Sequence, residues 1–219
     1  MKKFILSVVA ALSIPFAAMA QDIEELLPKA NAGDAKAMVE LAEAYANSWD
    51  DGASEKAVKW FTKAADAGNA DAMFELYEAY NMGSYGLDSD DDVAKKWLDK
   101  ACAKGHGEAL YAKGISIYYE NESEGLKLLL KGAEGNSANA CMFLASLYNN
   151  SWSDSYDPSK AFQWAKKGAE LGLGEAQYTL ATYYLKGVGT TPNKAEAVKW
   201  LKVAAENEYS TAVEILSWL

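Results

Sequence analysis

Apolar side chains recur along this chain with a period of about 36 residues. One alanine, termed the anchor, marks each unit, and the intervals between successive anchors are 35, 37, 31, 36 and 36 residues: Ala37, Ala72, Ala109, Ala140, Ala176 and Ala212. In four units a leucine follows four residues later and a tyrosine eight residues later, so these side chains share one helix face. The third unit has Lys113 and Ile117 at those places. A repeat of this length is typical of solenoids built from helix pairs.

A second apolar helix follows in each unit. Tryptophan recurs at one position in it, and leucine replaces it in the third unit: Trp60, Trp97, Leu128, Trp164 and Trp200. Small residues such as Ala64 and Ala101 lie one turn later, where they allow close helix contact. Because the spacing of the large side chains is that of the repeat itself, we interpret them as packing residues rather than as a cofactor site.

Helix-ending and helix-starting residues divide the chain into units. Glycines such as Gly68 and Gly172 end second helices, while Pro158 and Pro192 stand where second helices begin. The pattern predicts a single all-α domain over residues 21–219, an α/α solenoid of about five helix pairs with terminal capping helices. The units are expected at 33–67, 68–104, 105–135, 136–171 and 172–207, followed by a C-terminal capping helix at 208–219.

The first twenty residues have the pattern of a secretory signal peptide. Lys2 and Lys3 precede an apolar run from Phe4 to Phe16, and Ala18-Met19-Ala20 forms a small-residue cleavage signature. The apolar run is shorter than the roughly 20 residues that span a bilayer, which argues against a membrane anchor. We therefore expect a periplasmic or secreted protein that begins at Gln21 and does not insert into a membrane.

Charge narrows the range of partners. The chain contains no arginine, and the 19 lysines that remain after cleavage face 31 acidic residues. Nucleic acids and anionic membrane surfaces need basic clusters, which this composition does not supply. We expect a neutral or basic protein or peptide partner and no nucleic acid.

The pattern A-x-x-x-L-A/G-x-x-Y, a G-x-G turn and K-A-x-x-W-x-x-K-A-A-x-x-G resembles the Sel1-like repeat (SLR), a relative of the tetratricopeptide repeat. The resemblance covers residues 33–219; it is closest in Gly172–Asn207, which includes Lys186-Gly187-Val188-Gly189, and poorest in the third unit. It implies a right-handed superhelix whose first helices line a concave face. It also implies scaffold or adaptor work rather than catalysis.

The concave face that this resemblance implies contains the first-helix residues left over from packing. They lie one residue before, two after and six after the anchors, where acidic, aromatic and apolar side chains recur. We expect them to form a groove for an extended or helical peptide. The candidate partner-binding residues are Val39, Phe74, Glu78, Tyr111, Ile115, Met142, Tyr178 and Thr182. The alternative, that these side chains pack between helices as core, stays open because periodicity does not fix facing to within one helical step.

Two turns share an Asn-Ser-Trp sequence, at Asn47–Trp49 and at Asn150–Trp152. A tryptophan in a turn usually buries its ring, so we expect each ring to fold back over its own helix pair. A contact site on the rim of the solenoid is the alternative.

Residues suited to catalysis or metal binding are scarce. His106 is the only histidine, and its place at a predicted helix start indicates capping rather than a general base. The run Asp88–Asp92 resembles the opening of a calcium loop, but Val93 stands where that loop needs glycine, so we interpret the acids as helix-start residues. We expect no enzymatic activity, no cofactor and no metal.

Cys102 and Cys141 are the only cysteines. An oxidising compartment favours disulfides, so a bond between them is one possibility. In the cysteine-rich members of the family that this chain resembles, disulfides join a second helix to the following first helix across eight residues. The partners here would be Leu110 and Ala133, so each cysteine is half of a different pair. We therefore expect two separate, small buried residues.

These features predict a periplasmic or secreted scaffold or regulator that binds a protein or peptide in its groove. Two alternatives stay open: a β-lactam-binding or β-lactam-hydrolysing enzyme, like some cysteine-rich relatives, and a secreted effector aimed at a host protein. The enzyme would need an activated serine, and the chain has no S-x-x-K motif.

Overall fold

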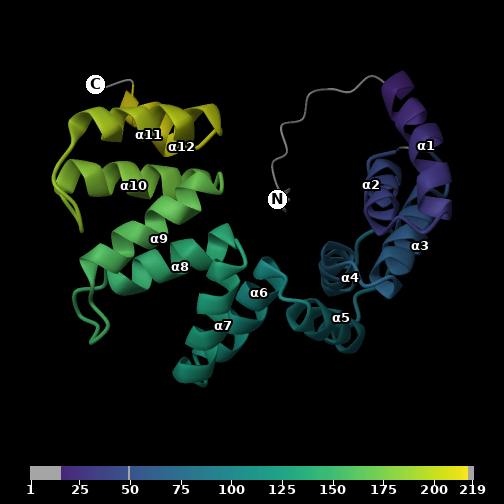
Figure 1. The fold of residues 1–219 in the computed structure, drawn as a ribbon, viewed down its shortest axis with the longest axis horizontal. Helices are drawn as coiled ribbons and strands as arrows, with labels where there is room; N and C mark the ends of the chain where they lie inside the picture. The colour runs from purple at the N-terminus through teal and green to yellow at the C-terminus, as the bar shows by residue number, and fades with distance from the viewer. Residues whose placement is uncertain (1–15, 49, 217–219) are drawn as a thin grey trace. The chain divides into compact units, whose positions relative to one another are not determined.

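The computed structural model describes residues 16–48 and 50–216, and within them every regular element is an α-helix (Figure 1). These residues form twelve helices: α1 (Phe16–Asn31), α2 (Ala35–Ala46), α3 (Ala53–Asp66), α4 (Ala70–Met82), α5 (Asp91–Ala103), α6 (Gly107–Tyr118), α7 (Glu122–Glu134), α8 (Ala138–Tyr148), α9 (Pro158–Glu170), α10 (Gly174–Lys186), α11 (Lys194–Glu206) and α12 (Ser210–Leu216). The predicted all-α class is confirmed. Residues 1–15 of the predicted signal peptide lie outside the described residues, and the predicted cleavage point after Ala20 falls within α1.

The chain forms two compact units, Met1–Trp97 and Leu98–Leu219, and α5 runs across the division. In the first unit α2 packs against α1 and α3, and α3 packs against α4. In the second unit each helix from α6 to α12 packs against the next, and α8 also contacts α6 and α10 (Figure 1). First helices of successive repeats therefore lie side by side in the second unit.

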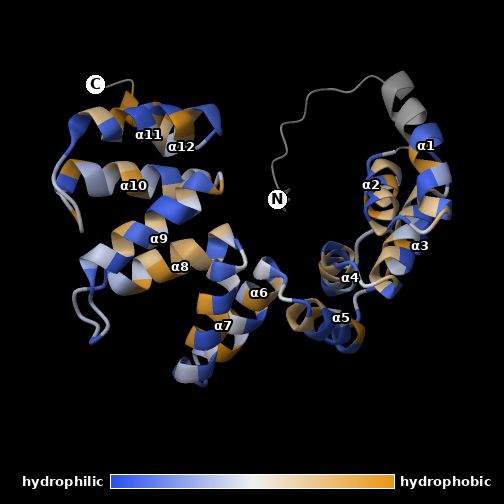
Figure 2. Cartoon of the chain, viewed as in Figure 1, coloured by the Kyte–Doolittle hydropathy of each residue, from blue (hydrophilic) through white to orange (hydrophobic). Residues whose placement is uncertain are grey.

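The repeated apolar positions form the core. All six anchor alanines are buried, as are the leucines that follow them by four residues in α2, α4, α8 and α10. The residue after the repeated tryptophan is also buried in α3, α7, α9 and α11: Phe61, Leu129, Ala165 and Leu201. Each large aliphatic side chain that is removed from water in this way stabilises the fold by about 1.5–3 kcal/mol. Figure 2 shows the outcome, with apolar and hydrophilic residues alternating around the same helices.

The third repeat uses glycine where the other repeats have larger side chains. A Cβ on Gly114 of α6 would lie 2.9 Å from Cγ of Leu129, and a Cβ on Gly125 of α7 would lie 2.4 Å from Cα of Tyr118. Any side chain at these two positions would therefore force α6 and α7 apart. The repeat that lacks the tryptophan thus has a close contact between its two helices.

The turns between repeats share one backbone geometry. Their last helix-ending residues have φ values of 96°, 92°, 80°, 65° and 93° at Gly33, Gly68, Gly105, Asn136 and Gly172, in the left-handed region that favours glycine and asparagine. The next helix is then capped by a side chain that accepts a hydrogen bond from a backbone N–H group in its first turn. The capping residues of α2, α4, α6 and α8 are Asp34, Asn69, His106 and Ser137. Each such cap stabilises its helix by about 1 kcal/mol.

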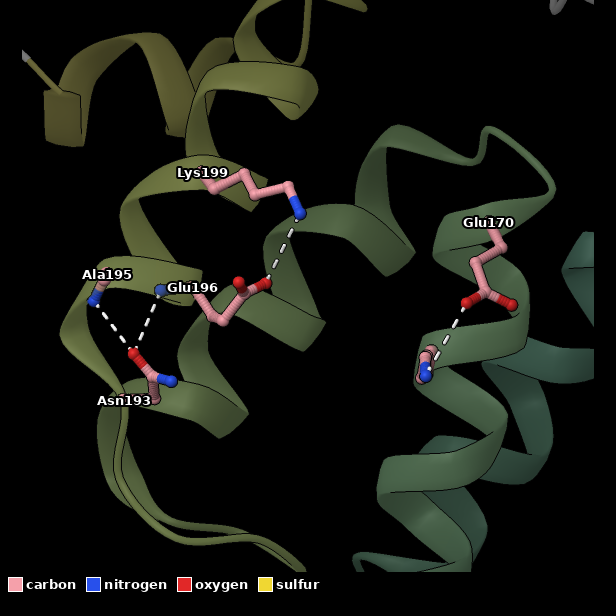
Figure 3. A network of polar contacts seen from close by, with 6 residues as sticks. Glu170, Asn193, Ala195, Glu196 and Lys199 are labelled. Carbon is pink, nitrogen blue, oxygen red and sulfur yellow. Dashed lines mark hydrogen bonds and ion pairs between the residues drawn. The ribbon is translucent and has the colours of Figure 1, made fainter.

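The second helices α5, α7, α9 and α11 are capped in the same way, as α11 illustrates (Figure 3), whereas α3 follows Gly52 and has no side-chain cap. Asn193 Oδ1 accepts hydrogen bonds from the backbone N–H groups of Ala195 and Glu196, both at 3.1 Å. The ion pair Glu196–Lys199 lies on the same helix, with its closest N–O distance at 3.7 Å. Its exposure to water means that it contributes little to stability, so the cap is the main polar feature that fixes this helix start.

Candidate functional site

The predicted groove residues of the second unit are half-buried on α6, α8 and α10. Tyr111 and Ile115 pack against the core cluster around Leu129, Met142 packs against the cluster of α9 and α10, and Tyr178 packs against the cluster of α10 and α11. The remaining predicted residue, Thr182, is also half-buried and donates its hydroxyl to the carbonyl of Thr179 at 2.7 Å. All five side chains keep part of their surface in water, and Tyr111, Ile115, Met142 and Tyr178 also pack against clusters that include residues of the next repeat.

Polar groups from three first helices gather beside these half-buried residues. Asn139 Nδ2 of α8 donates to Glu108 Oε2 of α6 at 3.0 Å, which joins the two repeats. Burial raises the pKa of the Tyr111 phenol, and the carboxylates of Glu108 and of Glu175, from α10, raise it further. Carboxylates from two repeats therefore act on one phenol. Glu108, Tyr111, Asn139 and Glu175 are termed the tyrosine–carboxylate surface.

Two of the three groove residues predicted in the first unit are partly exposed. Phe74 and Glu78 are half-buried on α4, and the ring centroid of Phe74 lies 5.5 Å from that of Tyr77. Val39, however, is only 8 % exposed. Its place in the core leaves it no surface for a partner, so the core alternative holds at this position.

Carboxylates converge on α4 of the first unit and are joined there by a tyrosine from the following turn. Burial raises the pKa of Glu75 to about 7, and the carboxylates of Glu78, Glu43 and Asp71 add to the rise. Burial likewise raises the pKa of Tyr85 to about 12, with Glu75, Glu78 and Glu43 contributing. Near neutral pH Glu75 is thus partly protonated. These five residues are termed the acidic cluster.

Two members of the acidic cluster were missed by the sequence pattern. Glu75 lies three residues after its anchor, outside the three positions selected there. A signal was nevertheless available, because Asp71, Glu75 and Glu78 are spaced four and three residues apart and so share one helix face. Tyr85 left no such signal, since a backbone with φ of 56° places its ring 6.0 Å from that of Phe61.

An open cleft with a volume of about 610 Å³ lies in the second unit between α5, α6 and α7. Its lining residues are Asp99, Cys102, Ala103, Gly105, Leu110, Lys113, Leu128, Lys131, Glu134 and Gly135. Lys113 stands at the position where other first helices have the repeated leucine, and its Nζ pairs with Asp99 Oδ1 at 2.6 Å. Burial raises the pKa of the Cys102 thiol, so the nucleophilic thiolate is scarce near neutral pH. The cleft therefore presents no activated nucleophile.

Both cysteines are free, and Cys141 is buried as expected, but Cys102 is only half-buried, which corrects the expectation of two buried residues. Cys141 is buried, and its Sγ lies 3.9 Å from the carbonyl oxygen of Ala133, its counterpart eight residues earlier. Gln177 occupies the equivalent place one repeat later and donates to the carbonyl of Ala169 at 3.3 Å. The position thus links a first helix to the end of the preceding second helix without a disulfide.

Two residues with potential for chemistry act in helix capping, as predicted. His106 Nδ1 accepts the backbone N–H of Ala109 at 3.2 Å, and Asp90 Oδ1 accepts that of Val93 at 3.0 Å. Within residues 16–48 and 50–216, no three His, Cys, Asp or Glu side chains gather in a way that would hold a metal ion. The same part of the chain contains no helix with the length and apolar character to cross a membrane.

Trp152 contradicts the expectation that turn tryptophans cover their own helix pair. Its side chain is 96 % exposed in the turn between α8 and α9. The corresponding Trp49 lies outside the described residues. At Trp152, the expectation was wrong, and the alternative of a contact site on the rim stays a prediction.

Comparison with known proteins gives one consistent family. The Sel1 repeat model matches residues 35–69, 70–106, 107–137, 138–173 and 174–209. The chitin synthase regulator SKT5 of Saccharomyces cerevisiae is 43% identical over 60 residues, which are 27% of this chain and 9% of that protein. The chain spans about a tenth of the length of the curated relatives it matches.

Solved structures show the same fold. A Sel1 repeat protein from Oxalobacter formigenes is similar with a TM-score of 0.66 and 25% identity, over 87% of this chain and 86% of that one. The protein c5321, a protective antigen of uropathogenic Escherichia coli with an SLR fold, gives a TM-score of 0.63 and 24% identity over 87% of this chain and 42% of that one. The helical-repeat architecture is therefore shared along most of the chain.

Proposed function

Because this chain belongs to the Sel1 repeat family, whose members are generally protein–protein interaction scaffolds, we propose that it binds a polypeptide partner on the exposed sides of its first helices. The family is typically non-enzymatic, and the partly exposed side chains of the first helices support a binding role. The partner is a neutral or basic segment that carries apolar side chains. The scaffold holds this partner in place or regulates it.

One observation carries this proposal: in each unit, carboxylates lie beside half-buried aromatic rings on first helices. In the second unit these are Glu108 and Glu175 around Tyr111, and in the first unit they are carboxylates of the acidic cluster on α4, the helix that also carries Phe74. A lysine or arginine from a partner would relieve the repulsion between the carboxylates, while an apolar side chain would cover the rings. Such a surface favours a basic segment over an acidic one.

Binding of a basic partner at the acidic cluster is expected to release protons. A cation placed beside Glu75 favours its ionised form and lowers its pKa from about 7 toward the usual range of a carboxyl group. Association near pH 7 then releases up to about half a proton per complex. Calorimetric titration with the identified partner in buffers of different ionisation enthalpy measures this release directly.

A pull-down with charge-neutral variants tests the proposal. The double variant Glu108→Gln and Glu175→Gln removes both carboxylates of the tyrosine–carboxylate surface. We expect it to retain the helical circular dichroism of the wild type and to recover several-fold less partner from a cell-envelope extract. The matched control neutralises Glu134 and Glu206, two exposed acids at the ends of second helices. Equal recovery by the test and control variants would refute a first-helix binding surface in the second unit.

We further propose that the protein acts in the periplasm, with secretion from the cell as the alternative address. The support is the N-terminal pattern of Lys2 and Lys3, an apolar run and the Ala18-Met19-Ala20 signature. Fractionation of the native producer should place the protein in the periplasmic fraction, and N-terminal sequencing should read Gln21 first. A mature chain that still begins at Met1 would reject export by this signal.

A further inference from the structure

The turn between α8 and α9 holds its tryptophan out in water. The backbone N–H of Trp152 donates to Asn150 Oδ1 at 3.1 Å, and that of Ser153 donates to the carbonyl of Asn150 at 3.0 Å. At the end of the turn, the N–H of Asp157 donates to the carbonyl of Tyr148 at 2.8 Å. These bonds close the turn on itself, so the exposed indole is part of an ordered loop. The ordered loop leaves this large aromatic ring accessible to a partner.

The preceding turn of the same unit also presents an aromatic ring. Figure 1 shows the α6–α7 and α8–α9 turns following one another along one edge of the second unit. Tyr119 is 82 % exposed there. Its ring meets that of Tyr118 edge-on with centroids 5.6 Å apart, and Tyr118 in turn meets Phe143 of α8 at 5.1 Å. Ring contacts thus connect Tyr119 to the repeat that carries Trp152.

Acidic residues lie close to these rings in the sequence. The two turns and the helix starts beside them contain five acids and no lysine between residues 119 and 124 or between residues 149 and 157: Glu120, Glu122, Glu124, Asp154 and Asp157. Two of the five are paired with lysines of the following helix, Glu124 with Lys127 at 3.7 Å and Asp157 with Lys160 at 3.3 Å. The edge therefore has an acidic surplus around exposed aromatic rings.

We propose that this edge, residues 119–124 and 150–157, is a second interaction surface, which takes a basic polypeptide segment with an arginine or lysine stacked on Trp152 and paired with Asp154. A cation over an indole face is attracted by the ring electrons, and a guanidinium group can stack and bind a carboxylate at once. Anionic lipid would be repelled by the five acids. A second copy of this chain, with a formal net charge of −10, would be repelled as a whole.

This surface is separate from the one in the proposed function. Glu108, Asn139 and Glu175 lie in the first turns of α6, α8 and α10, whereas Trp152 lies beyond the last turn of α8. An eleven-residue helix is roughly 15 Å long at 1.5 Å per residue, so the two surfaces sit at opposite ends of the same helices. A partner can engage either surface without the other.

The test is a calorimetric titration of the full chain, at low ionic strength, with two synthetic 12-residue peptides. One peptide carries four arginines spaced by glycine and serine, and the other carries four glutamates in the same frame. We expect binding of the arginine peptide alone, and a loss of about three- to fivefold in affinity in Trp152→Ala. Asp154→Asn should lower the affinity as well. The matched controls Leu171→Ala and Glu206→Gln, located at the opposite edge, should bind as the wild type does.

Several outcomes would overturn the proposal. An affinity unchanged in Trp152→Ala, or one lowered equally in the two controls, would place the peptide elsewhere, as would a loss of binding in the Glu108→Gln and Glu175→Gln double variant. Sedimentation velocity that showed a dimer dissociated by Trp152→Ala would assign the edge to a second copy. Flotation with phosphatidylglycerol vesicles that required Trp152 would assign it to lipid. The envelope pull-down with the Glu108 and Glu175 variants tests the first-helix surface independently.

Discussion

Replacement of Glu75 by glutamine should stabilise the first unit at alkaline pH. The pKa of Glu75 in the folded chain is about 7, against the usual 4.5, because burial and three neighbouring carboxylates disfavour its charge. A carboxyl whose pKa is raised by folding does not destabilise the fold below pH 4.5. The cost grows between pH 4.5 and pH 7, and it is fully present above pH 7. Glutamine keeps the shape of the side chain and removes the charge.

The size of the effect follows from the pKa difference. At about 1.4 kcal/mol per pKa unit, the wild type loses about 2–3 kcal/mol relative to Glu75→Gln as the pH rises from 5 to 8. Urea unfolding at pH 5 and pH 8, followed by circular dichroism, measures the free energy of unfolding of both proteins. We expect a difference below about 1 kcal/mol at pH 5 and the larger gain at pH 8.

A matched control lies in the preceding repeat. Glu40 also sits three residues after its anchor, but it pairs with Lys36 at 3.4 Å on an exposed surface. Glu40→Gln should therefore lower stability slightly, by less than about 0.5 kcal/mol. If Glu75→Gln did not raise the free energy of unfolding at pH 8, or raised it equally at pH 5 and pH 8, folding would not disfavour the ionised form of Glu75.

Three further predictions concern the packing of the second unit. Ala133→Cys should form a disulfide with Cys141 and raise the free energy of unfolding by about 2 kcal/mol, as measured by mobility on non-reducing gels and by urea unfolding with and without reductant. Gly125→Ala should destabilise the chain by about 2 kcal/mol, because the added Cβ would meet the backbone of Tyr118, and urea unfolding measures this loss. Half-buried Cys102 should react slowly with a thiol reagent in the native state, while Cys141 should react only on unfolding.

Each of these predictions has a result that contradicts it. Persistence of two free thiols after mild oxidation of the Ala133→Cys variant would mean that the two helices are farther apart than the structure shows. Ser123→Ala, an exposed site in the same helix as Gly125, is the control for helix propensity, and equal effects at the two sites would argue against close α6–α7 contact. Rapid native-state labelling of Cys141 would mean that its repeat opens.

The fold could be predicted from the sequence because the same packing positions recur in successive repeats. Alanine at the anchor, leucine four residues later and a large residue on the second helix are each repeated, and each proves to be core. The third unit was harder to interpret, since two of its packing residues are Gly114 and Gly125. A glycine carries no hydrophobic signal, and only the helix contact shows why its size matters.

The candidate site was predictable only in part, because periodicity assigns a side to a residue but not a depth. Phe74 and Tyr111 were placed correctly on the partly exposed side, whereas Val39, from the same set, is buried. Trp152 was wrongly expected to fold back, because the hydrogen bonds that close its turn are a property of the loop. Tyr85 reaches the acidic cluster through a positive φ that no spacing rule predicts.

Site-specific photo-crosslinking tests the central claim most directly. A crosslinker at Ser146, exposed on the first helix α8, should attach to a polypeptide in cells at a higher yield than one at Gln163, exposed on the second helix α9. The account predicts a discrete crosslinked band from position 146 that weakens when Glu108 and Glu175 are neutralised. A band from position 163 alone, or none from position 146 in cells that make the protein at its native level, would contradict it.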